Sequence, residues 1–327
     1  MTLPRLLLYL VCSSVFAALI GGYFGALHPA FDSLAHFRLH FAVLAAVLGA
    51  ALALKGGFLG GASMAVSGLL VLTTTLGPVE LSPSSAGAPG GEQPVYRLLQ
   101  VNLRYNNQTP KEVIRLISRL RPDVITAEEF SDMWRPHLSS IRPLYPYFFD
   151  CQGDDETGGV AIFSRRPFDD STPAYCSPDG ALGLRAVNFG GRAVQIGAMH
   201  LYWPWPHRQA RQISKMEPQF KSIALSGMPA LLAGDANSAP WSHAVRRIEK
   251  MSETTALRYR GGSWIHRLLP PAWAGWLGIP IDNVFAAGIN VRAIATQAAD
   301  GSDHLPVLVE FSLRDTVSAG AQAALAN

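Results

Sequence analysis

Three long apolar stretches open the chain, and a finer alternation of apolar and polar residues follows them. Residues 6–27 and 56–79 contain no charged residue, and residues 37–54 are apolar except near their start. At a rise of about 1.5 Å per residue, helices of these lengths cross the roughly 30 Å hydrocarbon core of a bilayer. The pattern therefore predicts about three transmembrane helices, at 6–27, 37–54 and 56–79.

Details of this first third leave alternatives open. Arg38 and His40 could snorkel to the lipid headgroups, and Lys55-Gly56-Gly57 would form a tight hairpin. The first apolar run could instead be a cleaved secretory signal, although it is long for one. Arg5 and Lys55 obey the positive-inside rule weakly, and an odd number of spans then places residue 80 onward outside the cytoplasm.

Short apolar runs ending in polar residues fill the chain from residue 95 to residue 313. Between the first two runs, residues 110–120 have helical spacing, with Val113 and Ile117 on one apolar face. Alternating strands and helices are typical of an α/β fold, and this length is ample for one core. The predicted strands cover residues 97–103, 122–127, 159–164, 193–199, 228–233, 281–286 and 307–313.

Composition sharpens this division of the chain. Charged residues make up 16% of the 327 residues, but only six of them lie in residues 1–94. The overall values exclude a disordered chain, a disulfide scaffold and a coiled coil. We predict an anchor at 1–80, a Pro/Gly/Ser-rich linker at 81–94, one domain at 95–313 and a flexible tail at 314–327.

Two cysteines, Cys151 and Cys176, occur in the predicted outer domain. Outside the cytoplasm they could form a disulfide, and two unpaired thiols are the equally good alternative.

Polar residues that suit catalysis or metal binding recur at the ends of the predicted strands. A single carboxylate in such a place is usually a turn residue or a helix cap. A series of them at one edge of a layered α/β fold is where binding sites are built. The series comprises Asn102, Glu129, His200, Asp235, Asn237, Asp282, Asp303 and His304.

The donor atoms of this series are mainly oxygen. The chain lacks the Cys/His spacing of zinc sites, a HExxH motif, a Gly-x-Ser-x-Gly elbow and a P-loop. Carboxylate and amide oxygens suit Mg²⁺, Mn²⁺ or Ca²⁺, and histidines beside them can transfer protons. Such a set fits phosphoryl or phosphodiester cleavage.

Seven motifs in order carry a family resemblance. They are QVNLRYN around Asn102, PDVITAEEF at 122–130, GVAIFSRRP at 159–167, MHL at 199–201, GDAN at 234–237, IDNVF at 281–285 and SDHLP at 302–306. Together they resemble the endonuclease/exonuclease/phosphatase superfamily, which includes pancreatic-type deoxyribonuclease and neutral sphingomyelinases. The apolar amino terminus resembles its membrane-anchored VanJ/YafD-like branch. The resemblance implies a two-sheet α/β sandwich with a divalent-metal site where the sheets meet.

The resemblance also implies roles for individual residues. Glu129 matches the principal metal ligand, with Asn102 and Asp303 beside it. Asp235 matches the carboxylate that orients the attacking water, and Asn237 the amide that contacts phosphate. The remaining matches are His200 as a hydrogen-bond donor to the phosphate or leaving oxygen, His304 as a general base or phosphate-binding histidine, Asp282 as the carboxylate that orients it, and Arg165 as a phosphate clamp or, equally well, a solvated arginine.

Two positions depart from the family pattern. Glu128 stands where the family usually has Gln, which adds a negative charge and would alter metal affinity or the pH optimum. Asn283 stands where the membrane branch commonly has His, which leaves that position without an assigned role.

Aromatic residues flank the predicted catalytic strands. Tyr202 and Trp203 follow His200, with Trp205 close behind, and Trp273 and Trp276 belong to a second group before the Ile281 strand. Aromatic side chains of this kind favour membrane interfaces, sugars or exposed bases, although core packing explains any single one. As a group they suggest a lipid-facing rim, with Tyr202 and Trp203 binding substrate.

The sequence thus predicts a membrane-anchored, Mg²⁺- or Mn²⁺-dependent phosphohydrolase for a lipid-linked phosphate or pyrophosphate, of the undecaprenyl-pyrophosphate type, at the outer membrane face. An extracytoplasmic nuclease or phosphodiesterase is the alternative, weakly supported by a net charge of +3. A non-catalytic membrane-tethered binding module is a third. We expect no obligate protein partner.

Overall fold

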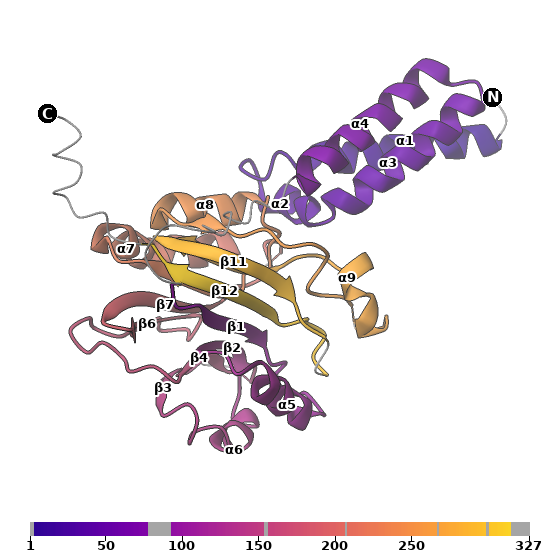
Figure 1. Ribbon diagram of the computed structural model, residues 1–327. Coiled ribbons are helices and arrows are strands. Elements are labelled where there is room, and N and C mark those ends of the chain that lie inside the picture. The colour runs from indigo at the N-terminus through magenta and orange to yellow at the C-terminus, as the bar shows by residue number, and fades with distance from the viewer. Residues whose placement is uncertain are drawn as a thin grey trace, which may run out of the picture.

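The computed structural model describes residues 3–77, 93–153, 156–206, 208–266, 268–298 and 301–314. They form a bundle of apolar helices, called the anchor after the prediction, and a two-sheet α/β sandwich, and Figure 1 shows the bundle projecting from the sandwich beside α8. Most of the predicted linker and nearly all of the predicted tail lie outside the described residues.

The anchor contains the three predicted apolar helices, α1 (Leu3–Gly21), α3 (Arg38–Leu54) and α4 (Phe58–Leu76). By length and composition, α1 and α4 can each cross a membrane. The short helix α2 (Pro29–His36) and α3 meet this criterion together, as a pair bent by 69°. The described chain therefore holds two helices that could span a membrane, or three if the bent pair is one span.

The first helix ends at Gly21, so the prediction that it continues to residue 27 is wrong. The chain turns at Gly22 and Gly25 and returns through α2, which the apolar pattern did not indicate. A Cβ atom on Gly22 would lie 3.1 Å from the backbone nitrogen of Ala35, and one on Gly25 would lie 2.4 Å from Asp32 Oδ1. Only glycine allows this close return of the chain onto α2.

Glycines also bring α3 and α4 together. A Cβ atom on Gly61 would lie 2.4 Å from the backbone nitrogen of Ala53, and one on Gly68 would lie 2.5 Å from the carbonyl oxygen of Ala42. Small residues that let two backbones approach in this way are typical of helix pairs in membranes. The predicted tight hairpin between these helices is present, with Gly56 at a φ of 97°.

Two mixed six-stranded sheets face each other in the sandwich, which confirms the predicted fold class (Figure 1). In order, the first sheet contains β11 (Ile289–Thr296), β12 (Val307–Leu313), β1 (Tyr96–Asn102), β2 (Val124–Phe130), β4 (Gly159–Ser164) and β3 (Tyr147–Cys151). The second contains β5 (Tyr175–Cys176), β6 (Leu182–Phe189), β7 (Arg192–His200), β8 (Ala230–Asp235), β10 (Asp282–Ala287) and β9 (Thr255–Ala256).

Three apolar clusters hold the layers together. The central one lies between the sheets and includes Leu98, Ile162 and Ile196. Two outer clusters pack helices on the sheets. The helices are α5 (Pro110–Leu120) and α6 (Trp134–Ser139) on the first sheet, and α7 (Gln209–Ser226) and α8 (His243–Ser252) on the second. Helix α5 has the predicted bounds and buries Val113 and Ile117 as expected.

Cys151, at the end of β3, and Cys176, in β5, form a disulfide bond. Of the two alternatives that the sequence left open, the structure therefore has the paired cysteines. The bond ties the edge strand of the first sheet to the edge strand of the second.

The anchor and the sandwich contact each other directly, through α2 and the start of α8. The indole nitrogen of Trp241 donates a hydrogen bond to the carbonyl oxygen of Ala35 at 2.6 Å. Ala35, Trp241 and Ala239 form a small buried apolar cluster. The guanidinium of Arg258 donates to the carbonyl oxygen of Thr75, near the end of α4, at 3.2 Å.

The two polar residues at the start of α3 belong to this junction. Arg38 is buried, with its guanidinium 4.2 Å from the ring centre of Tyr23, so the expectation that it snorkels to the headgroups is wrong. Cation–π packing and a contact with the Gly22 carbonyl compensate for its lost hydration. His40 Nε2 lies 2.8 Å from the carbonyl oxygen of Leu277, in the sandwich.

Candidate active site

Three polar residues form a row across neighbouring strands of the second sheet. His200 and Asp235 end the parallel strands β7 and β8, and they are register partners. Asp282 begins the antiparallel strand β10, and its register partner is also Asp235. The sheet therefore brings three side chains to one edge, although they lie far apart in the sequence.

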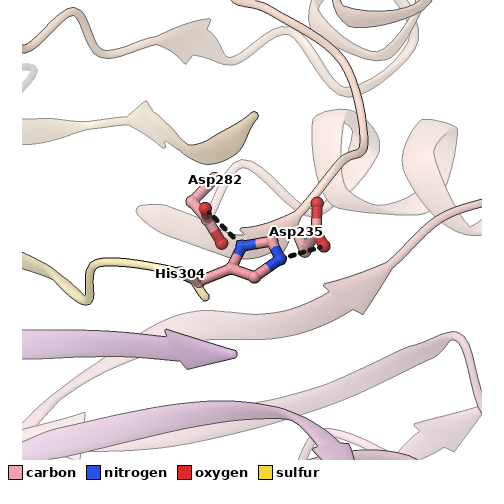
Figure 2. A group of neighbouring side chains, drawn as sticks. All are labelled: Asp235, Asp282 and His304. Carbon is pink, nitrogen blue, oxygen red and sulfur yellow. Dashed lines mark hydrogen bonds and ion pairs between the residues drawn. The ribbon is translucent and has the colours of Figure 1, made fainter. Parts of the chain in front are cut away.

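His304 reaches this row from the loop before β12, which belongs to the other sheet. Its Nδ1 lies 2.8 Å from Asp282 Oδ2, and its Nε2 lies 3.6 Å from Asp235 Oδ2. Figure 2 shows the imidazole held between the two carboxylates. His200 Nε2 lies 3.8 Å from the same oxygen, Asp235 Oδ2.

Burial and charge set the protonation of this cluster. Burial alone would lower the pKa of His304, but the charges of Asp282 and Asp235 outweigh it and raise the pKa to about 10. Burial acts to raise the pKa of Asp282, but the charge and hydrogen bond of His304 bring it below its ordinary value. Burial raises the pKa of Asp235 to about 6, against the opposing charge of His304. Near neutral pH, His304 and Asp282 form an ion pair beside a carboxylate that titrates close by.

The first sheet contributes Asn102, which ends β1, and Glu129, in a bulge of β2. The bulge holds Glu129 at a φ of 55°, a left-handed conformation that is uncommon outside glycine. Asn102 Nδ2 donates to Glu129 Oε1 at 3.2 Å and to Asp235 Oδ2 at 3.1 Å. The backbone N–H of Tyr105 donates to Glu129 Oε2 at 2.8 Å. Asn102 thus joins the carboxylates of the two sheets.

Glu128, the departure from the family pattern, is fully buried beneath the cluster. Burial raises the pKa of Glu128 well above its ordinary value, and this outweighs the hydrogen bond that it accepts from Gln100. Gln100 Nε2 lies 2.7 Å from Glu128 Oε2 and 2.8 Å from Asp282 Oδ1. Because burial favours the neutral acid, the expectation that Glu128 adds a negative charge to the site is corrected.

Two asparagines shape the loop after β8. The backbone N–H of Asn237 donates to Asp235 Oδ1 at 2.8 Å, and its Nδ2 donates to the carbonyl oxygen of Leu201 at 2.7 Å. Asn283 is buried, and its Nδ2 donates to the carbonyl oxygen of Ser238 at 2.7 Å. Asn237 is therefore held against Asp235, whereas Asn283 ties down the loop beneath it. The predicted phosphate contact of Asn237 stays a prediction.

Asp303 lies next to His304 but faces different partners. Its Oδ2 accepts a hydrogen bond from the indole N–H of Trp264 at 3.3 Å, and its Oδ1 lies 4.0 Å from Arg104 Nε. Its charge is one of those that raise the pKa of His304. Its predicted role as a metal ligand stays a prediction.

The aromatic residues after His200 separate into two environments. Trp203 packs edge-on against His36 of the anchor, with ring centres 5.1 Å apart, and its ring centre lies 6.0 Å from that of Trp264. The ring centre of Trp264 lies 6.5 Å from that of His304. Tyr202 is exposed and lines a cavity with the basic residues Arg208, Arg211 and Lys215.

The structure places Arg165 away from this site, so the expectation of a phosphate clamp there is wrong. Strands β2 and β4 are antiparallel, and Ser164 pairs with Val124 at the start of β2. Glu129 lies five residues further along β2, about 17 Å away at the rise of an extended strand. The guanidinium of Arg165 donates instead to the carbonyl oxygen of Arg121.

The donor set fits a hard divalent cation. Asp235, Asp282 and His304 each offer an atom within 4.8 Å of the others, and Glu129 adds a carboxylate through the Asn102 bridge. Carboxylates gathered in a buried place need compensating positive charge, and oxygen donors suit Mg²⁺ or Mn²⁺. Because His304 and Asp282 already bind each other, Glu129 and Asn102 are the better candidates to hold the ion.

Three supporting residues were not predicted from the sequence. Gln100 was detectable as an amide within an otherwise apolar strand, and Ser302 as part of the SDH motif. The Ser302 hydroxyl donates to the carbonyl oxygen of Asn102 at 2.9 Å. The Tyr259 hydroxyl donates to the carbonyl oxygen of Asp282 at 2.6 Å, and no local pattern indicated this contact.

Comparison with known proteins extends these observations. Residues 99–304 match the sequence profile of the endonuclease/exonuclease/phosphatase family. Over 87 residues the chain is 33% identical to a UPF0294 protein of Vibrio vulnificus, which covers 26% of this chain and 28% of that protein.

Solved structures share the fold at low sequence identity. An endonuclease/exonuclease/phosphatase from Bacteroides vulgatus superposes with a TM-score of 0.55 at 18% identity, covering 68% of this chain and 100% of that one. The D. rerio TDP2 complex with a single-stranded DNA product gives 0.54 at 16% identity, covering 67% and 99%. The human Nocturnin catalytic domain with bound sulfate gives 0.51 at 17% identity, covering 69% and 97%.

Proposed function

Because the chain belongs to the endonuclease/exonuclease/phosphatase family, whose members are metal-dependent phosphoester hydrolases, we propose that it is a membrane-anchored phosphohydrolase for a lipid-linked phosphate or pyrophosphate. The substrate would be of the undecaprenyl-pyrophosphate type, presented at the outer face of the membrane. Hydrolysis of the pyrophosphate would yield the lipid monophosphate and inorganic phosphate.

The observation that carries the choice of a lipid substrate is the short path from the anchor to the site. His36 contacts Trp203, Trp203 contacts Trp264, and Trp264 contacts His304, through ring-centre distances of 5.1, 6.0 and 6.5 Å. An active site at this distance from the anchor can receive a headgroup whose acyl or prenyl chain stays in the bilayer. A soluble substrate would require no such proximity.

The side chains support in-line attack by water on phosphorus. A bound divalent ion, held by Glu129 with Asn102, would neutralise charge on the non-bridging oxygens. Asp235 is suited to orient the water and take its proton, since a pKa of about 6 makes it a better base than an ordinary aspartate.

The histidines would act on the phosphate. His304, held as a cation by Asp282, would donate from Nε2 to a non-bridging oxygen or to the leaving oxygen, so we assign it proton donation rather than general base catalysis. His200, whose Nε2 also lies near Asp235, would donate to another phosphate oxygen. A new O–P bond forms to water, the bridging P–O bond breaks, and the leaving phosphate accepts a proton.

The disulfide supports an extracytoplasmic location for the sandwich. Disulfides persist in oxidising compartments and are rare in the cytosol. The bond between Cys151 and Cys176 therefore agrees with the orientation that Arg5 and Lys55 favour.

Hydrolysis assays on the purified full-length protein, with Mg²⁺ or Mn²⁺, test the proposal. We expect phosphate release from polyprenyl pyrophosphate and no nicking of plasmid DNA. Nicking without phosphate release would identify a nuclease instead, and inactivity on both, without metal binding, would identify a binding module. The Asp235→Asn variant should be inactive, and activity in that variant would contradict the site assignment.

A further inference from the structure

Exposed apolar side chains gather in one short segment of the sandwich. Residues 268–277, which contain the 3₁₀ turn η1 (Pro271–Trp273) and the helix α9 (Ala274–Leu277), present Trp276 at 90% exposure and Leu268 at 82%. Trp273, Leu269 and Leu277 are exposed as well. Five large apolar side chains exposed within ten residues form a patch that water solvates poorly. We call these residues the α9 segment.

The α9 segment contacts the anchor where α3 begins. The carbonyl oxygen of Leu277 lies 2.8 Å from Nε2 of His40, the third residue of α3. Figure 1 shows α9 beside the end of the helical bundle that faces the sandwich. A bilayer that surrounds α1, α3 and α4 would have its surface near this end, which would put the α9 segment at the depth of the headgroups.

The charge of the surrounding sequence matches an anionic membrane surface. Residues 254–281 contain three arginines and one histidine, and no aspartate or glutamate. Tryptophan is enriched at membrane interfaces because its ring is apolar while its N–H binds polar groups. Arginine near such a segment is attracted to anionic headgroups.

The α9 segment is firmly connected to the active site. Glycines close its base, since a Cβ atom on Gly262 would lie 2.3 Å from the backbone of Gly278. Trp264 bridges to Ile279 on one side and to His304 on the other. The backbone N–H of Leu305 donates to the carbonyl oxygen of Ser263 at 2.6 Å. A lipid contact at the α9 segment would therefore fix the height of the site above the bilayer.

We propose that the α9 segment inserts its apolar side chains into the same bilayer that holds the anchor and forms a second membrane contact beside the active site. This inference rests on the membrane location in the proposed function, but not on the proposed substrate. It gives the enzyme two attachment points, so that phosphate groups at the lipid surface meet His304 and Asp235 at a defined height.

Site-directed fluorescence quenching in the full-length protein tests this proposal. In a Cys12→Ser background, Trp276→Cys is labelled with a polarity-sensitive fluorophore and placed in nanodiscs of phosphatidylethanolamine and phosphatidylglycerol. Some of the lipids carry a nitroxide on the acyl chain. Leu225→Cys is the matched control, because Leu225 is 87% exposed and lies at the C-terminal end of α7.

We expect nitroxide quenching at position 276 to exceed that at position 225 at least twofold. Equal quenching at both positions would overturn the proposal. A second outcome would also overturn it: an apolar environment at position 276 that shows no nitroxide quenching and appears only when a disc holds more than one chain. In that case a second copy of the protein, and not lipid, would cover the segment. The readout requires no turnover, so inactivity on polyprenyl pyrophosphate would refute the proposed substrate and leave this result unaffected.

Discussion

Asp32, on α2 of the anchor, accepts a hydrogen bond from the backbone N–H of Ala244, on α8 of the sandwich, at 2.9 Å. The other carboxylate oxygen accepts from the N–H of His243 at 2.6 Å. The first N–H groups of a helix have no partner within it, and the helix dipole favours a negative charge there. The anchor thus caps the start of α8, which follows strand β8, where Asp235 lies, and the loop that carries Asn237.

Replacing Asp32 with Ala should therefore destabilise the sandwich although Asp32 lies in the anchor. We expect the free energy of unfolding to fall by about 1–3 kcal/mol, from two lost hydrogen bonds and the lost charge at the helix end. Thermal unfolding of the detergent-solubilised protein measures this. Asp132→Ala is the control, because that carboxylate is exposed. Equal stability of the two variants would show that the contact is not formed in solution.

The ion pair of Asp282 and His304 predicts a shift in the pH dependence of hydrolysis. His304 loses its proton as the pH rises through its pKa of about 10, and activity that needs the cation is lost with it. In Asp282→Asn the largest of the charges that raise this pKa is gone, while Asp235 and Asp303 remain, so the alkaline limb should move to lower pH. We also expect kcat to fall about 10²- to 10⁴-fold, as when a carboxylate that orients a catalytic imidazole is removed.

Initial rates between pH 6 and pH 11 measure both effects. Glu310→Gln serves as a control. Glu310 lies on β12, pairs with Arg97 of β1, and is remote from His304 in the register of the sheet. An alkaline limb at the same pH in Asp282→Asn and the wild type would contradict the assigned ion pair.

The ends of the apolar runs predicted the site residues from the sequence, but the sequence did not reveal the direction of each strand in its sheet. His200 and Asp235 could be grouped because both follow apolar runs, and β7 and β8 are indeed parallel. Arg165 follows a similar run, yet β4 is antiparallel to β2, so its end lies at the opposite edge. Direction depends on which strands pair, and that is set by the packing of the whole chain.

Hairpins were partly detectable from the sequence, and long-range contacts were not. Gly190 and Gly191 join β6 to β7 with φ values of 64° and 93°, and a Gly-Gly pair between apolar runs is a hairpin signal. By contrast, Asp32 and Ala244 are 212 positions apart. No local pattern identifies such a pair, because each residue alone resembles an ordinary surface position.

Glu128→Gln should leave the active-site cluster intact and alter the pH dependence of the free energy of unfolding. The folded pKa of Glu128 is raised by burial, so the folded state holds a proton that the unfolded state releases above about pH 4.5. Wild-type stability therefore falls as the pH rises above that value, until the folded pKa is reached, by up to about 1.4 kcal/mol per pH unit. The glutamine variant lacks this loss, so it should gain stability relative to the wild type between pH 5 and pH 8.

Denaturant unfolding at several pH values tests this expectation. A constant difference between the two proteins across pH 5–8 would show that the pKa of Glu128 is not raised. Glu112→Gln is the matched control, because Glu112 is exposed on α5 and pairs with Arg115 of the same helix.

The disulfide should contribute measurably to stability. Cys151 and Cys176 are separated by 25 positions. Closing a loop of that length lowers the conformational entropy of the unfolded chain, which stabilises the folded state by about 3 kcal/mol. Cys151→Ser should therefore lower the free energy of unfolding by about that amount, as should a reductant added to the wild type. The variant itself should be insensitive to reductant, and an equal response of both proteins to reductant would mean that the two cysteines are not bonded.

Glu129→Gln should separate metal binding from folding. A ligand that binds only the folded state stabilises it, by about 2.7 kcal/mol when its concentration is 100 times its Kd. We expect Mg²⁺ to raise the unfolding temperature of the wild type and to have little effect on the variant, whose amide lacks the charge.

Hydrolysis by the Glu129→Gln variant should fall at least about 100-fold, because the charge on the phosphate oxygens is no longer neutralised. Without Mg²⁺, the substitution removes the repulsion between two carboxylates but also one acceptor, since Glu129 accepts hydrogen bonds from both Asn102 and the Tyr105 N–H. Differential scanning fluorimetry with and without Mg²⁺, with Glu112→Gln as the control, measures this. Stabilisation by Mg²⁺ that survives in Glu129→Gln would place the ion elsewhere, with the buried group of Asp235, Asp282 and His304 as the remaining candidate.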